Sequence, residues 1–264
     1  MNTKHIFKSM TFTVAHHFFN VRKYNAFVMI CTWMAAFHFA GCTDASDETC
    51  TADVAITPIE TSAYVQFDPF LQSSNAVFKD CGNRQPRLDN RFSPFKGGGE
   101  APSLVVEHYS ALDCPHCASF AAYVDSMLAT QSKINARVRF YFHHYTFSRA
   151  LDTHMAAFAV SQQSMEKFWQ FHDIIYSNIY IHRDYQNLRD IAQHDLQLDM
   201  SLYDAATSLQ NESGMRNAGF LQHEKDIANA NCIPGTPTVY ICGEPVSDWR
   251  KLEGIILSYL RNEN

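Results

Sequence analysis

Two apolar runs predict β-strands on either side of a predicted helix. The first strand covers residues 104–109, and the second, residues 137–142, alternates apolar and other side chains. Between them, apolar side chains recur at the helical spacing i, i+4, i+8, at Phe120, Val124 and Leu128. The sequence therefore predicts a strand, a helix and a second strand in this order.

A long helical block and a short α/β ending follow. Apolar positions at helical spacing predict helices over residues 151–163, 165–180, 185–194, 202–210 and 214–231. An apolar strand over 238–241, a turn back and a closing helix over 252–260 complete the pattern. This order predicts an α/β fold whose helical block is inserted into one core.

Residues 43–99 have no sustained hydrophobic period. They are rich in Asp, Ser, Thr, Pro and Asn, and end in three consecutive glycines. We therefore predict a flexible tether over residues 42–98. Cys50 and Cys81 lie in it, and we expect them to pair with each other rather than to serve as free or functional thiols.

The N-terminus differs from the rest of the chain. It has no acidic residue before Asp44, it carries four basic residues, and residues 26–40 are apolar. These features predict a secretory signal over residues 1–41. Phe39-Ala40-Gly41-Cys42 resembles the lipobox of bacterial lipoproteins, which implies lipidation of Cys42. Ordinary cleavage nearby and an uncleaved membrane anchor are the alternatives. Each of these readings includes export, which places the other cysteines in an oxidising compartment.

Composition excludes several classes of protein. The 264 residues carry a formal net charge of −6, so nothing indicates a nucleic-acid partner. Ten glycines and nine prolines exclude a collagen-like or low-complexity chain, and eight cysteines are too few for a disulfide-framework miniprotein.

The candidate chemistry lies in Cys114-Pro115-His116-Cys117, between the first strand and the helix. A thiolate at a helix N-terminus is stabilised by free N–H groups and by the helix dipole, which lowers its pKa. Thiol–disulfide exchange needs such a thiolate. Pro115 suits the first turn, and His116 can stabilise the reduced form. Asp113 could cap this helix, but its charge would disfavour the thiolate.

Other uses of this spacing are weaker. A zinc site needs further ligands, and the adjacent His143 and His144 would point to opposite faces of a strand, so we expect no metal. A purely structural bridge between Cys114 and Cys117 would constrain little chain. Whether Cys232 and Cys242 pair with each other stays open.

Several motifs together resemble the DsbA family of thiol–disulfide oxidoreductases. The Cys-Pro-His-Cys motif resembles the active site of that family, residues 235–238 (Gly-Thr-Pro-Thr) resemble its cis-proline loop, and residues 167–173 are similar to a signature of its helical domain. The resemblance implies a thioredoxin-like fold over residues 99–147 and 229–264, with an inserted helical domain over residues 148–228.

The resemblance also implies roles for single residues. Cys114 would be the nucleophile and Cys117 the resolving thiol. The bond between Thr236 and Pro237 would be cis and would present backbone to substrate. The usual buried acid lies six residues before the first cysteine, where this chain has His108. Counting from Ala101-Pro102 instead favours Glu107.

These observations predict an exported, membrane-tethered oxidoreductase of the periplasm or cell envelope. It would oxidise cysteines of folding exported proteins and exchange electrons with a membrane redox partner. No bound cofactor is needed, since the Cys114–Cys117 disulfide carries the electrons. A disulfide isomerase or reductase of the same fold is one alternative, and a surface lipoprotein that only binds partners is the other.

Overall fold

The core of the protein is a five-stranded mixed sheet. The structure is a computed structural model that describes residues 64–261, apart from 74–75, 85, 147–149 and 181–183. The strands lie in the order β1-β3-β2-β4-β5. Their bounds are β1 Phe95–Lys96, β2 Leu104–Ser110, β3 Val138–His144, β4 Thr238–Ile241 and β5 Glu244–Pro245.

Strands β2 and β3 form the centre of the sheet. They are parallel, with Leu104 opposite Val138 and Ser110 opposite His144, and every residue of both strands is buried. Parallel strands need a crossover connection, which α2 (Pro115–Thr130) and α3 (Ser132–Arg137) supply. Strand β4 runs antiparallel to β2, with Tyr109 opposite Thr238. The end of β2 therefore lies beside the start of β4.

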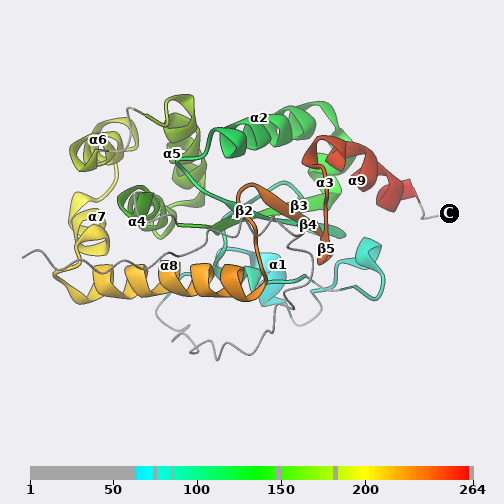
Figure 1. Cartoon of the computed structure of the whole chain (residues 1–264), viewed down its shortest axis with the longest axis horizontal. Coiled ribbons are helices and arrows are strands. Elements are labelled where there is room, and N and C mark those ends of the chain that lie inside the picture. The colour runs from blue at the N-terminus through cyan, green and yellow to red at the C-terminus, as the bar shows by residue number, and fades with distance from the viewer. Residues whose placement is uncertain (1–63, 74–75, 85, 147–149, 181–183, 262–264) are drawn as a thin grey trace, which may run out of the picture. The chain divides into compact units, whose positions relative to one another are not determined.

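Helices cover both faces of the sheet (Figure 1). Helices α2, α3 and α9 (Leu252–Arg261) lie on one side, whereas α8 (Glu212–Ala230) and α1 (Pro69–Gln72) lie on the other. The apolar face of α2 packs into the main core through Phe120, Val124 and Met127. Short 3₁₀ turns complete the chain: η2 Lys79–Cys81, η3 Asn90–Phe92 and η6 Trp249–Lys251.

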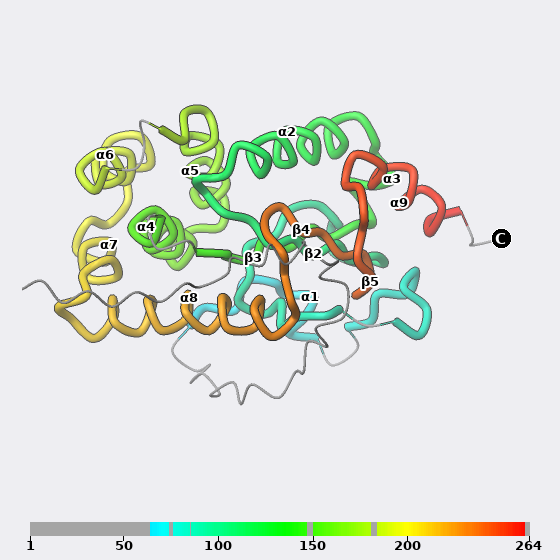
Figure 2. Tube along the Cα trace, in the orientation of Figure 1, coloured from blue at the N-terminus to red at the C-terminus, as the bar shows by residue number. Residues whose placement is uncertain are grey.

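A block of helices is inserted between β3 and β4, as predicted. The Cα trace in Figure 2 shows the succession α4, α5, α6, α7 and α8. The bounds are α4 Leu151–Ser161, α5 Met165–Ser177, α6 Tyr185–Asp190, a π-helical turn η5 Ile191–Asp195, and α7 Met200–Thr207. The block has its own apolar core, which includes Phe168, Phe171 and Tyr203. Among the described residues, no helix is long and apolar enough to span a bilayer.

The predicted tether is wrong for the part of it that the structure describes. Tyr64 packs against Phe158 and Phe220 of the helical block, and its hydroxyl donates to the Arg216 carbonyl at 2.8 Å. Asp68 caps α1 and makes a buried ion pair with Arg139 of β3 at 2.7 Å. This segment has no regular period because single side chains, rather than one face of a helix or strand, dock on the domain.

The predicted cysteine pairing is also wrong. Cys81 is bonded to Cys242, 161 residues further along the chain, and not to Cys50. The Arg137 side chain holds Asp80 at 2.6 Å, which fixes the η2 turn beside the sheet. Cys232 is disulfide-bonded too, but not to Cys242, so that pairing is excluded. The predicted signal and the lipidation residue Cys42 lie outside the described residues.

Candidate active site

Cys114 lies between the end of β2 and the start of α2. A three-residue loop, 111–113, follows the strand, and Cys114 is the N-cap residue of the helix. Pro115 occupies the first helical position, where a missing N–H costs nothing. The Cys114 side chain makes no capping hydrogen bond, and Asp113, which the sequence suggested as the cap, is not the N-cap residue. The N–H groups of the first turn are therefore left to interact with the Cys114 sulfur.

The surroundings of Cys114 favour its thiolate. A hydrogen bond from the Cys117 side chain lowers the pKa of Cys114 most strongly. Burial opposes this effect, whereas the Thr236 side chain and the N–H groups of Cys117 and His116 add to it. The net result is a pKa of about 5. Cys114 is partly exposed, so this thiolate is open to a partner sulfur.

Cys117 has the opposite character. It is completely buried in the first turn of α2, and burial raises its pKa. The hydrogen bond that it donates to Cys114 raises the pKa further. Both cysteines are free thiols, and they differ in exposure and in the direction of their pKa shifts. One sulfur can attack or be attacked from outside, and the other can react only with its neighbour.

The proline loop lies directly against Cys114. The bond between Thr236 and Pro237 is cis, as predicted. The Cys114 thiol donates to the Thr236 carbonyl at 3.4 Å. Thr238, the next residue after the proline, begins β4 and pairs with Tyr109 of β2. Cys114 and Thr236, which are 122 positions apart in the chain, therefore meet where β2 ends and β4 begins.

Pro115 and His116 form the outer surface of the motif. Both residues are exposed, in contrast to Cys117, which follows them directly. The backbone N–H of His116 contributes to the stabilisation of the Cys114 thiolate, while its ring faces solvent. The His116 ring can therefore contact a partner protein that approaches Cys114.

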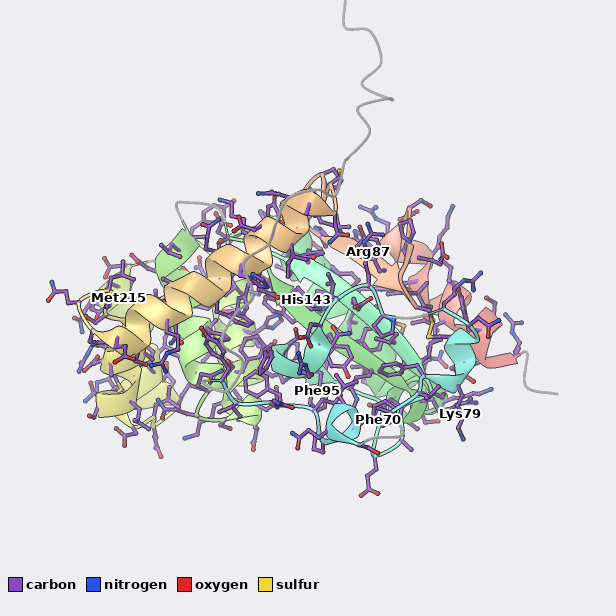
Figure 3. The ribbon with its side chains drawn as sticks, turned by 90° about the horizontal axis from the view of Figure 1, so that it is seen from below. Phe70, Lys79, Arg87, Phe95, His143 and Met215 are labelled. Atoms are coloured by element: carbon purple, nitrogen blue, oxygen red, sulfur yellow. A yellow bond between two sulfur atoms is a disulfide. The ribbon has the colours of Figure 1, made fainter. Side chains whose placement is uncertain are left out.

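Glu107 does not lie beneath the cysteines, so that prediction is wrong. Its carboxylate is fully buried on the other face of the sheet, where it accepts hydrogen bonds from the N–H groups of Arg87 and Leu88 at 2.8 and 2.9 Å, and from the Asn90 side chain at 3.0 Å. Figure 3 views this face, with Arg87 and His143 labelled. Successive strand residues point to opposite faces, and Glu107 points away from α2.

His108 occupies the face that Glu107 was expected to occupy. Its ring packs edge-on against Phe120 of α2, with ring centres 5.1 Å apart, and against Phe142 of β3. Burial lowers its pKa well below the usual value for histidine. The position six residues before Cys114 thus faces α2, as in the DsbA pattern, but it holds a neutral imidazole.

Two hydroxyl groups behind the active-site loop, those of Ser110 and Tyr176, were not predicted from the sequence. Ser110 is the last residue of β2, and its side chain, like that of Thr236, acts to lower the pKa of Cys117 against the larger effect of burial. The Ser110 Oγ also lies 3.1 Å from the hydroxyl of Tyr176 on α5. Tyr176 donates in turn to the carbonyl of Ala111 at 3.2 Å. Ser110 could have been noticed as a polar residue ending a buried strand, but nothing distinguishes Tyr176 from the other aromatic residues of its helix.

No metal centre is found in the part of the chain that the structure describes. There, no three His, Cys, Asp or Glu side chains lie close enough together to hold an ion. His143 hydrogen-bonds to Asn90 at 2.8 Å, and His144 lies against His154 at 2.8 Å. The rings of the two adjacent histidines therefore have different hydrogen-bond partners.

Comparison with known proteins gives the family. The model of a family described as thioredoxin matches residues 90–256. A 150-residue stretch is 26% identical to Na(+)/H(+) antiporter NhaA 3 of Salinispora tropica, covering 56% of this chain but only 21% of that protein. The chain thus spans about a fifth of this curated relative.

Solved structures share the fold. BdbD from Bacillus subtilis superposes with a TM-score of 0.53 at 18% identity, over 67% of this chain and 95% of that one. The thiol-disulfide exchange protein alpha-DsbA2 from Wolbachia pipientis gives 0.52 at 15%, over 63% and 86%. A thioredoxin-like oxidoreductase from Silicibacter pomeroyi gives 0.51 at 16%, over 64% and 92%. Together with the family match over residues 90–256, they show that this chain belongs to the thioredoxin family and has the DsbA-like form of its fold.

Proposed function

We propose that this protein is an exported thiol:disulfide oxidoreductase whose Cys114–Cys117 pair oxidises cysteines of folding envelope proteins. A substrate thiolate attacks Cys114 in the disulfide form, and Cys117 leaves. A second substrate thiolate then attacks the mixed disulfide, which forms the substrate disulfide and releases Cys114 as a thiolate. The protein is left as a dithiol, and a membrane redox partner reoxidises it.

One observation carries this proposal: the pKa of Cys114 is lowered to about 5 and that of Cys117 is raised. A cysteine with a low pKa is a good leaving group, so the second step is fast and favours substrate oxidation. A stabilised reduced form also makes the disulfide a stronger oxidant. The opposite shifts match an exposed attacking sulfur and a buried resolving sulfur.

Thr236 and Pro237 supply the surface for the substrate backbone. The Thr236 carbonyl lies 3.4 Å from the Cys114 sulfur, so a chain bound along residue 236 would bring its cysteine to Cys114. Recognition through backbone groups is independent of substrate sequence. This suits an enzyme that acts on many unfolded proteins.

The disulfides outside the motif support export. Cys81 is bonded to Cys242, and Cys232 is also disulfide-bonded. Such bonds persist in extracytoplasmic compartments and are rare where thiols are kept reduced. We place the protein in the periplasm or cell envelope, tethered by a lipid on Cys42 or by an uncleaved signal.

The test is the reduction potential of the Cys114–Cys117 pair, measured by equilibration of the purified mature chain with glutathione buffers. We expect a value near about −120 mV, the range of strong oxidants. The Cys114→Ser variant is the control, and we expect it to lose oxidation of a reduced, unfolded substrate protein.

Each other result has a definite meaning. A potential near about −270 mV would replace the oxidase by the reductase or isomerase. If the cysteine pair does not exchange with glutathione, a surface lipoprotein that only binds partners would be the better explanation.

A further inference from the structure

The three-residue loop that leads from β2 to Cys114 is buried along its whole length. Ala111, Leu112 and Asp113 are each at most 3% exposed. A buried loop lacks the regular backbone partners that a helix or a sheet provides, and each N–H or C=O group left unpaired there costs free energy. The position of this loop therefore depends on which groups pair with its backbone.

The loop backbone is paired at two points. The Ala111 carbonyl accepts the Cys114 N–H at 3.1 Å and the Tyr176 hydroxyl at 3.2 Å, so it stays paired if one donor is lost. The Leu112 N–H donates to Nε2 of His154, on α4, at 3.2 Å. Within the described residues, this ring nitrogen is its one acceptor. Loss of the nitrogen would leave a buried donor unpaired.

The His154 ring is itself held from behind. It is fully buried, and its Nδ1 lies 2.8 Å from Nδ1 of His144, the last residue of β3. The Phe142 ring packs edge-on against the His144 ring, with ring centres 5.0 Å apart. The His144 backbone N–H donates to the Glu224 carboxylate of α8 at 3.1 Å. Contacts from β3 and α8 thus fix the ring that accepts the Leu112 N–H.

The two histidines stay neutral, which suits a fixed acceptor. Burial lowers the pKa of His154 to about 3 and that of His144 well below its usual range. A neutral ring keeps one nitrogen free to accept a hydrogen bond, whereas a protonated ring can only donate. The Leu112 N–H can also only donate, so it requires a neutral His154 with no proton on Nε2.

We propose that His154 is a positioning residue for disulfide exchange, which accepts the Leu112 N–H and so fixes the loop that places Cys114 at the start of α2. The inference rests on the proposed exchange function and adds a residue of the inserted helices to its site. His154 acts through Leu112 and not on a sulfur atom. The loop matters because the N–H groups of the first helical turn stabilise the Cys114 thiolate only when they point at it.

Two amide variants of the full chain separate the two ring nitrogens of His154. The side-chain oxygen of glutamine reaches the position of Nε2, whereas that of asparagine, one methylene shorter, reaches only the position of Nδ1. Both amides are neutral and can accept a hydrogen bond. His154→Gln therefore keeps an acceptor for the Leu112 N–H, and His154→Asn removes it.

The first measurement is the pKa of Cys114, followed through the ultraviolet absorbance of its thiolate in the reduced protein. Cys114→Ser gives the background from other groups. We expect His154→Asn to raise this pKa by about one unit, because the loop no longer holds the sulfur in line with the N–H groups. His154→Gln should leave the pKa close to that of the unmodified chain.

The second measurement is the reduction potential of the Cys114–Cys117 pair in glutathione buffers. If the thiolate is stabilised about tenfold less, the reduced form is less favoured and the disulfide is a weaker oxidant. The potential of His154→Asn should therefore be lower by about 30 mV. That of His154→Gln should be unchanged.

His143→Asn is the matched control for the loss of a buried histidine. His143 is fully buried on β3, and its ring lies 2.8 Å from the Asn90 side chain and 3.3 Å from that of Ser93, both in the segment before β1. This variant should lower the urea midpoint of unfolding and leave the Cys114 pKa and the potential unchanged. The same pattern in His154→Asn would show a merely structural role and would overturn the proposal.

One measurement needs no variant and so does not depend on how well His154→Asn folds. Nitrogen-15 NMR of the unmodified chain reports which ring nitrogen of each histidine carries the proton. We expect His154 to carry it on Nδ1 alone at neutral pH. A proton on Nε2 would exclude the hydrogen bond from Leu112 and overturn the proposal.

The two amide variants also exclude another explanation. Equal shifts of the Cys114 pKa in His154→Gln and His154→Asn would mean that packing of the ring, and not the acceptor, sets this pKa, which would overturn the proposal. Failure of the proposed exchange function would look different, because the unmodified chain itself would then not exchange with glutathione.

Discussion

Cys114 and Cys117 show how position alone sets the chemistry of identical side chains. Cys114 stands at the N-cap, where N–H groups and the Cys117 thiol stabilise its anion. Cys117, one turn further, has lost its contact with water. The hydrogen bond between the two lowers the pKa of Cys114 and raises that of Cys117. The pair therefore holds one proton strongly and the other weakly.

Glu107→Gln tests whether the carboxylate acts in structure or in exchange. We expect unchanged reaction of Cys114 and Cys117, because Glu107 binds residues 87–90 on the opposite face. The free energy of unfolding should fall by about 1–3 kcal/mol. Both carboxylate oxygens of Glu107 accept N–H hydrogen bonds, and the NH₂ group of glutamine cannot accept one. Urea unfolding and glutathione exchange measure the two effects. A large loss of exchange with normal stability would contradict this assignment.

The same strand shows what the sequence could and could not tell at this scale. The cysteines, the adjacent proline and the cis-proline were predictable because each is a local motif. The choice between Glu107 and His108 was not, since a shift of one residue reverses the face of a strand. Ser110 and Tyr176 meet through tertiary packing, and no spacing in the chain brings them together.

At the scale of elements, the inserted helices hold the active-site loop. The N–H of Leu112 donates to His154 Nε2 of α4 at 3.2 Å, and Tyr176 of α5 donates to the Ala111 carbonyl. Leu112 itself is buried in the core of the helical block. The loop that sets the position of Cys114 is thus fixed by the insertion and not by the sheet alone.

These contacts determine the tautomers of two buried histidines. His154 Nε2 accepts a hydrogen bond from the Leu112 N–H, so its Nδ1 carries the ring hydrogen and donates to His144 Nδ1 at 2.8 Å. Both rings are therefore neutral. Burial lowers the pKa of His154 to about 3 and that of His144 well below the usual value.

The neutral histidines predict loss of stability in acid. The unfolded chain binds protons at these histidines below about pH 6.5, whereas folded His154 does not until about pH 3. Stability is therefore full above about pH 6.5 and falls as the pH drops, by about 1.4 kcal/mol per unit for each histidine. Urea unfolding between pH 8 and pH 4 measures the slope.

The matched variants for this prediction are His154→Gln and His194→Gln. His194 is exposed, so its replacement should leave the slope unchanged. His154→Gln should reduce the slope by about one proton. Equal slopes in all three proteins would show that His154 is protonated in the folded chain.

Most elements were predictable from hydrophobic spacing, since helices α4, α5, α7, α8 and α9 lie close to the expected ranges. The segment from Tyr64 onwards was not, because it has no period. Its anchors are single residues such as Asp68, which forms an ion pair with Arg139 and accepts a hydrogen bond from Tyr141. Such contacts depend on a surface that only the folded domain provides.

At the scale of the whole molecule, the segment before the sheet is an integral part of the domain. Cys81 joins it covalently to the end of β4 through Cys242. Phe78 and Cys81 belong to the same apolar core as Phe120 and Ile256. The domain therefore begins well before the residues that the cysteine motif indicates.

Replacing Cys81 and Cys242 together by alanine should lower the free energy of unfolding by about 2–5 kcal/mol, because a long loop is no longer closed in the unfolded chain. Exchange at Cys114 should persist under conditions where the variant is folded. Urea unfolding and glutathione exchange are the measurements. The control is Cys114→Ala with Cys117→Ala, which removes two thiols but no structural bond. Equal stability of the Cys81/Cys242 variant and the unmodified protein would contradict the prediction.

The Cys81–Cys242 bond also has a consequence for the synthesis and folding of the protein. Cys81 emerges early in synthesis, and its partner follows 161 residues later. In the export that we propose, Cys81 lacks its native partner until nearly the whole chain has crossed the membrane. Each new copy thus needs the reaction that we propose for the finished enzyme. Mature copies could then form the Cys81–Cys242 bond in newly synthesised chains. The amount of folded protein would in that case depend on the copies already present.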